Sequence, residues 1–333
     1  PAHGWWWFWD HETDPEQLNV HAFDISTAGQ THYLASGRVE GLLFDQFSID
    51  EEDGQIRLAT TDNRWSRWWD EDAPPPDNHI WVLDQVGSHL SVIGHVGGIA
   101  PNESIFAARF SGDRAFLVTF EQIDPLFTID LRDPTDPRVI GELEVPGFST
   151  YLHEIADDRL LAIGVGADEE GTARWGLTQI SLFDVRDFAN PTLQDTLPLE
   201  IEGEWTWSEA QWEHKAFQYW APKALLAVPA SSYREIGDPD GDGSYEWQYI
   251  SRLQLINVDL EAGLSLKGTI DHSDLYSTDD YWYYRDARRT IFMGDYIYAV
   301  SDRGITVHRA DDLGLVTQQP LGGNSPDDWY WWW

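Results

Sequence analysis

One short element recurs six times along this chain, and this repeat constrains the fold more than any other feature of the sequence. Each copy is a run of apolar and β-branched residues, and most copies end in aspartate or asparagine before a turn. The copies occupy residues 20–25, 80–84, 126–131, 180–185, 255–259 and 304–308. Short apolar runs bounded by turn-forming residues are typical of β-strands, and helical periodicity is nearly absent. We therefore expect an all-β chain built from repeated units.

A second pair of strands is expected between successive copies. Its clearest instances pair residues 44–49 with 55–60, 104–110 with 114–120, 150–155 with 159–164, 214–219 with 224–229, and 289–293 with 296–301. Four strands per unit, repeated at a spacing of roughly 45–75 residues, predict a β-propeller of four-stranded antiparallel blades. A β-sandwich with many insertions is the alternative, and the regular phase of the six copies favours the propeller.

The first copy has no inner strand pair upstream of Val20. The available segments are two tryptophan-rich runs, Trp5–Trp9 near the start and Trp329–Trp333 at the end. Propellers avoid open strand edges by joining their termini in one blade. We therefore predict one domain over residues 1–333, closed by residues 1–40 and 322–333. The ring would have six blades, or more if further sequence precedes Pro1.

The charge balance is strongly acidic, with 58 acidic against 21 basic residues and a net charge of −37. Nucleic acid and anionic lipid would be repelled, so neither is expected as a partner. The chain has no cysteine, which excludes a disulfide scaffold and a thiol nucleophile. No apolar run approaches the ~18 residues of a membrane span. Because the chain begins at Pro1, without a methionine or a signal-peptide pattern, we expect a processed protein or a fragment.

Several segments resemble a family of secreted bacterial and archaeal proteins with a C-terminal β-propeller domain. They are residues 47–51, 58–61, 124–127, 141–153, 214–217 and 301–305. The similarity extends from about residue 17 to about residue 320, and members usually carry additional N-terminal sequence. The resemblance implies a propeller and an exported protein that is secreted, periplasmic or held at the surface of a prokaryotic cell. It implies little about activity.

The tryptophans are unevenly placed on the predicted blades. In a four-stranded blade, the loop between strands 2 and 3 and the connection from strand 4 to the next blade share one face. All the long insertions are expected there, including a strand 2–3 loop over residues 231–247. Of the 19 tryptophans, all but Trp81 and Trp220 lie in these insertions or at the termini. They either pack on each other as an additional core or form an exposed platform for a carbohydrate or a protein. The candidate platform is Trp65, Trp68, Trp69, Trp205 and Trp207.

The segment Asp238–Glu246 has the pattern of a calcium loop. Asp238, Asp240 and Asp242 alternate and are followed by glycine, so their carboxylates can converge on one hard cation. The Ser244 carbonyl and Glu246 would complete the site. Tyr249 replaces the bidentate glutamate of an EF-hand, which favours an isolated structural Ca²⁺ loop between strands. An ordinary Asp-Gly turn is the alternative.

The innermost strands of the blades carry a set of polar residues. Alignment of the repeats places Gln46, Arg109, His153, His214 and Arg289 near the central channel. Such a channel could bind an anion or a transition metal, or its residues could hydrogen-bond neighbouring blades to each other. No nucleophile elbow, P-loop or His-Glu-x-x-His motif occurs. We therefore expect a calcium-stabilised binding or surface-structural module. An enzyme or metal-redox protein using the channel is the alternative, and the oligomeric state is left open.

Overall fold

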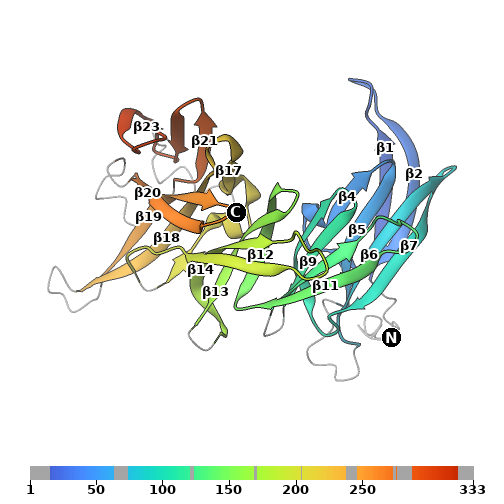
Figure 1. Cartoon of the computed structure of the whole chain (residues 1–333). Coiled ribbons are helices and arrows are strands. Elements are labelled where there is room, and N and C mark those ends of the chain that lie inside the picture. Colours follow the sequence, from blue (N-terminus) through green and yellow to red (C-terminus); the bar gives the residue numbers. More distant parts are fainter. Residues whose placement is uncertain are drawn as a thin grey trace, which may run out of the picture. The chain divides into compact units, whose positions relative to one another are not determined.

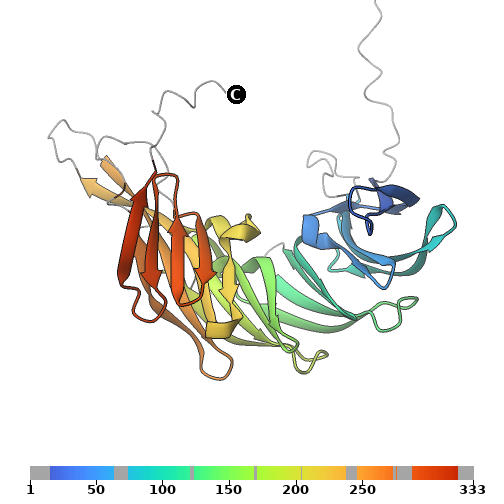
Figure 2. The same ribbon diagram turned by 90° about the horizontal axis from the view of Figure 1, so that it is seen from above.

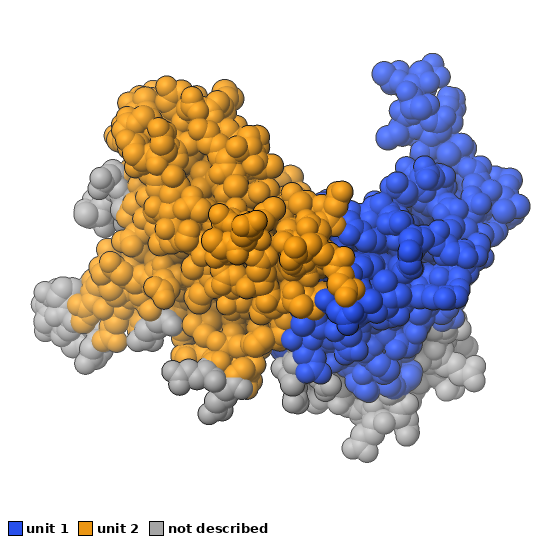
Figure 3. Space-filling view, viewed as in Figure 1, with its two compact units in different colours: residues 1–144, 188–190 blue, residues 145–187, 191–333 orange. Residues whose placement is uncertain are grey.

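The computed structural model describes residues 16–63, 74–120, 124–168, 171–203, 205–237, 246–272, 275 and 287–321. Contacts between residues divide the chain into two compact units (Figure 3). Unit 1 comprises residues 1–144 and 188–190, and unit 2 comprises residues 145–187 and 191–333. In the described residues every regular element is a β-strand or a short 3-10 helix, which confirms the all-β prediction.

Unit 1 contains two sheets (Figure 1). Sheet A has seven strands, β1 Gln17–Asp24, β2 His32–Glu40, β3 Leu42–Leu43, β4 Ile49–Glu52, β5 Gln55–Asp62, β6 Asp77–Val86 and β7 His89–Ile99. Sheet B has four antiparallel strands in the order β11-β10-β9-β8, namely β8 Ser104–Ser111, β9 Arg114–Phe120, β10 Asp124–Asp130 and β11 Arg138–Val145.

Unit 2 contains three sheets. Sheet C consists of β12 Phe148–Ala156, β13 Arg159–Ala167, β14 Ala173–Asp184 and β15 Thr192–Pro198. Sheet D consists of β16 Thr206–Trp207, β17 Gln218–Trp220, β18 Leu225–Gly237, β19 Glu246–Asp259 and β20 Gly263–Asp271. Sheet E, whose four strands lie side by side in Figure 2, consists of β21 Arg289–Met293, β22 Tyr296–Val300, β23 Gly304–Arg309 and β24 Leu315–Pro320.

Sheets B, C and E have the predicted four antiparallel strands in consecutive order. Sheet A differs, because the hairpin β1–β2 joins the next blade through a parallel contact between Ser36 and His89. That hairpin is the outer half of the predicted first blade. The segments expected to complete it, Trp5–Trp9 and Trp329–Trp333, lie outside the described residues. The count of six blades and the closure of the ring in one domain therefore stay predictions.

The aspartates that end the repeated strands form the same turn in four copies. The carboxylates of Asp24, Asp130, Asp184 and Asp259 each accept a hydrogen bond from the backbone N–H two residues later, at 2.8–3.0 Å. An aspartate in this position mimics a backbone turn and ends the strand. This local chemistry explains why the repeat is visible in the sequence.

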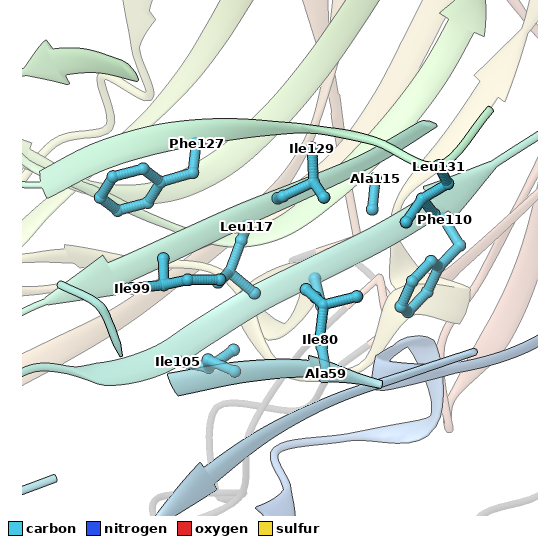
Figure 4. Close-up of a cluster of buried hydrophobic side chains, with 11 residues drawn as sticks. Ala59, Ile80, Ile99, Ile105, Phe110, Ala115, Leu117, Phe127, Ile129 and Leu131 are labelled. Atoms are coloured by element: carbon cyan, nitrogen blue, oxygen red, sulfur yellow. The ribbon is translucent and has the colours of Figure 1, made fainter. Parts of the chain in front are cut away.

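Each unit has an apolar core between its sheets. In unit 1 strands of sheets A and B pack side chains against each other (Figure 4), namely Ala59, Ile80, Ile99, Ile105, Ala108, Phe110, Ala115, Leu117, Phe127, Ile129 and Leu131. In unit 2 a corresponding cluster joins sheets D and E and includes Leu225, Leu253, Leu255, Ile270 and Ile297. Alternate strand residues point to opposite faces, so these cores follow the apolar alternation of the sequence.

Candidate functional site

The predicted calcium ligands lie almost entirely outside the described residues. Asp238, Asp240, Asp242 and Ser244 lie in residues 238–245, and the candidate platform residues Trp65, Trp68 and Trp69 lie in residues 64–73. Both ranges are outside the described residues. Glu246 is the first residue of β19 and pairs with Gly237, the last residue of β18. The calcium loop thus stays a prediction, located between the paired ends of two described strands.

The strands that flank this loop are much longer than the sequence indicated. Residues 231–247 were expected to be an insertion, but β18 continues to Gly237 and β19 begins at Glu246. The insertion prediction was wrong here because the continuous pairing from Leu225↔Asn257 to Gly237↔Glu246 extends the hairpin. The other strands of sheet D pair with β18 only as far as Ser232 and with β19 only as far as Arg252. Residues 233–237 and 246–251 therefore form a two-stranded ribbon.

One face of this ribbon is aromatic. Tyr233 pairs with Tyr249, and Glu235 pairs with Trp247. The Trp207 ring of β16 lies 5.2 Å from the Tyr233 ring and 5.8 Å from the Tyr249 ring, between centroids. The two tyrosine rings are 5.2 Å apart in an edge-to-face arrangement, a favourable geometry for aromatic pairs. We call Trp207, Tyr233, Trp247 and Tyr249 the aromatic row.

The opposite face of the same ribbon is polar and internally paired. Arg234 donates to Glu202 at 2.6 Å and also to the side chain of its cross-strand neighbour Gln248. Arg252 donates to Asp271 at 3.3 Å. Because side chains alternate between the faces of a strand, Arg234 and Gln248 lie on one side, whereas the rings and Glu235 lie on the other.

The aromatic row is partly exposed. Tyr233 is 39% exposed and Trp247 is 47% exposed, whereas Trp207 and Tyr249 are half-buried. Trp205, two residues before Trp207, is 64% exposed. The structure therefore brings one predicted platform residue, Trp207, into a packed cluster and leaves the other, Trp205, largely open. Sequence reasoning missed Tyr233 and Tyr249 as the partners of Trp207, because that contact depends on strand register.

A second group of predicted residues meets near the inner strands of unit 2. The Tyr151 hydroxyl lies 3.1 Å from Nδ1 of His153 on β12. The Phe217 ring lies 5.2 Å from the Tyr151 ring and 5.4 Å from the His153 ring. The His214 ring is 6.5 Å from that of Tyr151. His153, on the same strand as Tyr151, and His214, in the segment before β17, thus both lie near Tyr151.

His214 does not lie on a strand, contrary to the prediction for residues 214–219. Residues His214–Ala216 form a 3-10 helix, and strand β17 begins only at Gln218. The Glu213 carboxylate accepts a hydrogen bond from the Lys215 backbone N–H at 3.1 Å, and this cap closes the turn. Glu213 also lies 3.6 Å from Nδ1 of His214.

Arg289 takes part in an ion-pair network that links sheets D and E. Its guanidinium donates to Glu209 at 3.0 Å, and Arg288 donates to the same carboxylate through two bonds of 2.8 and 2.9 Å. Burial raises the pKa of Glu209, but the hydrogen bonds from Arg288 and Arg289 outweigh this and hold that pKa below its usual range. This network matches the interpretation in which channel-side residues join neighbouring blades.

The two remaining channel candidates belong to unit 1. Gln46 lies in a 3-10 helix, Gln46–Ser48, and not on the predicted strand 44–49, because Asp45 caps the Phe47 and Ser48 backbone N–H groups at 2.9 and 3.2 Å. Arg109 lies on β8, with its guanidinium 5.1 Å from the centre of the Phe47 ring. This is a cation–π distance.

Sheet A holds an imidazole pair that was not predicted from the sequence. Nδ1 of His79 lies 3.2 Å from Nε2 of His95, and the His95 ring stacks on Trp81 with centroids 3.8 Å apart. Burial lowers the pKa of His95, and its neighbour His79 lowers it further. The alternation of His79 and Trp81 on one strand was the available signal. The pairing of Trp81 with His95 could not be read from it.

No group of three or more histidine, aspartate or glutamate side chains suited to a metal ion occurs among the described residues. Residues 238–245 of the Asp238 loop lie outside the described residues. Within the same part of the chain, no helix has the length and apolarity needed to cross a membrane.

Comparison with known proteins decides the family. The sequence matches the family described as the beta propeller domain over residues 2–313. The chain belongs to this family. An uncharacterised protein of Methanocaldococcus jannaschii is 37% identical over 217 residues, 65% of this chain and 30% of its own length. An uncharacterised protein of Archaeoglobus fulgidus is 32% identical over 311 residues, 93% of this chain and 40% of its own length. The beta propeller chain therefore spans less than half of these curated relatives.

Solved structures are more distant from this beta propeller domain. Apo AztD from Citrobacter koseri has a TM-score of 0.47 and 15% identity, over 89% of this chain and 65% of its own. Sqt1 from Chaetomium thermophilum has a TM-score of 0.37 and 10% identity, over 80% of this chain and 68% of its own.

Proposed function

We propose that this β-propeller is an exported binding module that holds a partner on its tryptophan-rich face. The observation that carries the proposal is the aromatic row with Trp205 beside it, a set of partly exposed rings on one side of a strand ribbon. Exposed aromatic patches with a polar surround usually mark binding sites, and tryptophan and tyrosine are the commonest anchors. The partner is a protein or a carbohydrate at the surface of a prokaryotic cell.

Calcium has a structural role in this proposal. A Ca²⁺ ion held by Asp238, Asp240, Asp242, the Ser244 carbonyl and Glu246 would tie together the ends of β18 and β19. Those strands are paired up to Gly237 and Glu246, so an ion in the connecting loop would fix the far end of the ribbon. Three members of the aromatic row, Tyr233, Trp247 and Tyr249, lie on the same two strands.

The blade arrangement supports a module that presents one face. Four-stranded antiparallel sheets form a rigid support, and loops and ribbons at their ends vary freely. We propose six blades in this chain, closed by the tryptophan-rich termini, with further blades supplied in longer proteins such as the archaeal relatives.

The proposal is tested by retention of the purified protein on cell envelopes of the organism that produces it, called host envelopes below. The full chain should sediment with envelopes, and the Trp205→Ala and Trp207→Ala variants should be released at least about tenfold more readily, since a lost anchor costs over about 1.4 kcal/mol. Trp212, 69% exposed and outside the aromatic row, supplies the matched control. Equal retention of Trp212→Ala and both other variants would contradict the proposal.

A further inference from the structure

The six side chains that point to the aromatic side of the ribbon and its base have an unusual composition for this protein. They are Ser231, Tyr233 and Glu235 on β18 and Trp247, Tyr249 and Ser251 on β19. Glu235 is the only charged residue among them, in a chain whose net charge is −37. Ser231 and Ser251 join their hydroxyl groups at 3.2 Å beneath the rings. Both serines are buried, so the exposed part of this face consists of Tyr233, Glu235, Trp247 and part of Tyr249.

Apart from Glu235, the charged side chains at the ribbon and its base do not lie on this face. Arg234 and Arg252 lie on the other side, where Glu202 and Asp271 pair with them. An anionic partner would therefore meet no cation among the described residues of the aromatic face and would be repelled by the protein as a whole. A cationic peptide would find one carboxylate, that of Glu235, with which to form an ion pair.

The exposed area is also small. A tyrosine or tryptophan side chain buries about 150–250 Å² when fully covered. With Tyr233 39% and Trp247 47% exposed, and with Trp207 and Tyr249 half-buried, the aromatic row offers about 300 Å². A stable protein interface buries about 800 Å² on each partner. The row is too small for a folded protein and large enough for a few sugar rings.

From these observations we infer that the aromatic row binds a neutral oligosaccharide. This inference rests on the proposed binding function and specifies its partner. A pyranose ring has an apolar face of C–H groups, which packs on an aromatic ring, and a polar rim that can hydrogen-bond to tyrosine hydroxyl groups. Mutual packing of Trp207, Tyr233 and Tyr249 holds the rings in place before binding, which reduces the entropy lost with the ligand.

The test measures binding of the full chain to four neutral hexasaccharides, cellohexaose, xylohexaose, mannohexaose and N-acetylated chitohexaose, by calorimetry and tryptophan fluorescence. A heparin hexasaccharide and a lysine-rich peptide are the charged comparisons. At least one neutral probe should bind, and Trp247→Ala and Tyr233→Ala should each weaken it about tenfold. Trp247→Phe should retain most of the affinity, and Trp212→Ala should bind as the parent does.

The inference is overturned if none of the four neutral probes binds, if only the lysine-rich peptide binds, or if Trp247→Ala and Trp212→Ala bind a neutral probe equally well. Thermal unfolding of each variant identifies any loss of affinity that is due to misfolding. If Trp247→Ala misfolds, the affinity of Trp247→Phe decides the outcome, and loss of binding by a folded Trp247→Phe would contradict the inference. If the sugars fail while envelope retention still depends on Trp205 and Trp207, the binding function stands and its partner is not a neutral glycan.

Discussion

At the scale of single residues, a buried hydrogen-bond chain joins His272, directly after β20, to Thr306 and His308 on β23. Nδ1 of His308 lies 2.9 Å from the Leu313 carbonyl, which only accepts, so this nitrogen carries the proton. Nε2 of His308 lies 2.9 Å from the Thr306 hydroxyl, which can donate to it. The Thr306 oxygen in turn accepts from Nε2 of His272 at 2.7 Å. Nδ1 of His272 is buried and has no hydrogen-bond partner among the described residues, so a second proton there would be unsatisfied and the neutral imidazole is favoured.

This arrangement predicts acid sensitivity. Burial, and then the neighbouring His308, lower the pKa of His272 from 6.5 to about 4. In the unfolded chain His272 takes up a proton below about pH 6.5, so the folded state loses stability progressively as the pH falls from 6.5 to 4. The loss attributable to this group reaches about 3 kcal/mol. Urea denaturation across this range measures it, and His272→Asn should flatten the slope. An unchanged slope in that variant would contradict this assignment.

At the scale of elements, the sequence predicted strands well where local chemistry alone defines them. The expected strand 289–293 is strand β21, and the expected pair 104–110 with 114–120 differs from β8 and β9 by one residue. The aspartate turns mark such ends. The strands predicted at Gln46 and His214 are absent, because the Asp45 and Glu213 caps stabilise 3-10 helices at Gln46–Ser48 and His214–Ala216. Prediction also failed for the ribbon. The Asp- and Gly-rich sequence there indicated a loop over residues 231–247, whereas β18 extends to Gly237 and β19 begins at Glu246.

The calcium loop is an element whose contribution can be measured. Chelation with EGTA should lower the melting temperature of the full chain. Bound Ca²⁺ contributes about 2.7 kcal/mol when its free concentration is a hundred times the Kd. Asp240→Asn should abolish the response. Asp53→Asn is the matched control, because Asp53-Gly54 is an ordinary exposed turn in which asparagine tolerates the φ of 53°. A melting temperature that EGTA leaves unchanged would show that the Asp238 loop is only a turn.

At the scale of the whole molecule, the repeat predicted the fold class, and the tryptophan distribution is the basis for the proposed binding face. The repeat identified the propeller, and membership of the beta propeller family confirms it. The partners of Trp207 could not be predicted, because Tyr233 and Tyr249 meet it only through the register of β16, β18 and β19. The grouping of His153 and His214 around Tyr151 likewise depends on how sheets C and D pack.

The central claim is that the aromatic row and Trp205 form the binding surface, and tryptophan footprinting tests it most directly. The full chain is exposed to hydroxyl radicals with and without host envelopes, and oxidation of each tryptophan is measured by mass spectrometry. Trp205 and Trp247 should be protected by the envelopes at least about fivefold, because a bound partner covers their exposed rings. Trp212 should oxidise at the same rate in both samples. Equal oxidation of Trp205, Trp212 and Trp247 with and without envelopes would contradict the claim.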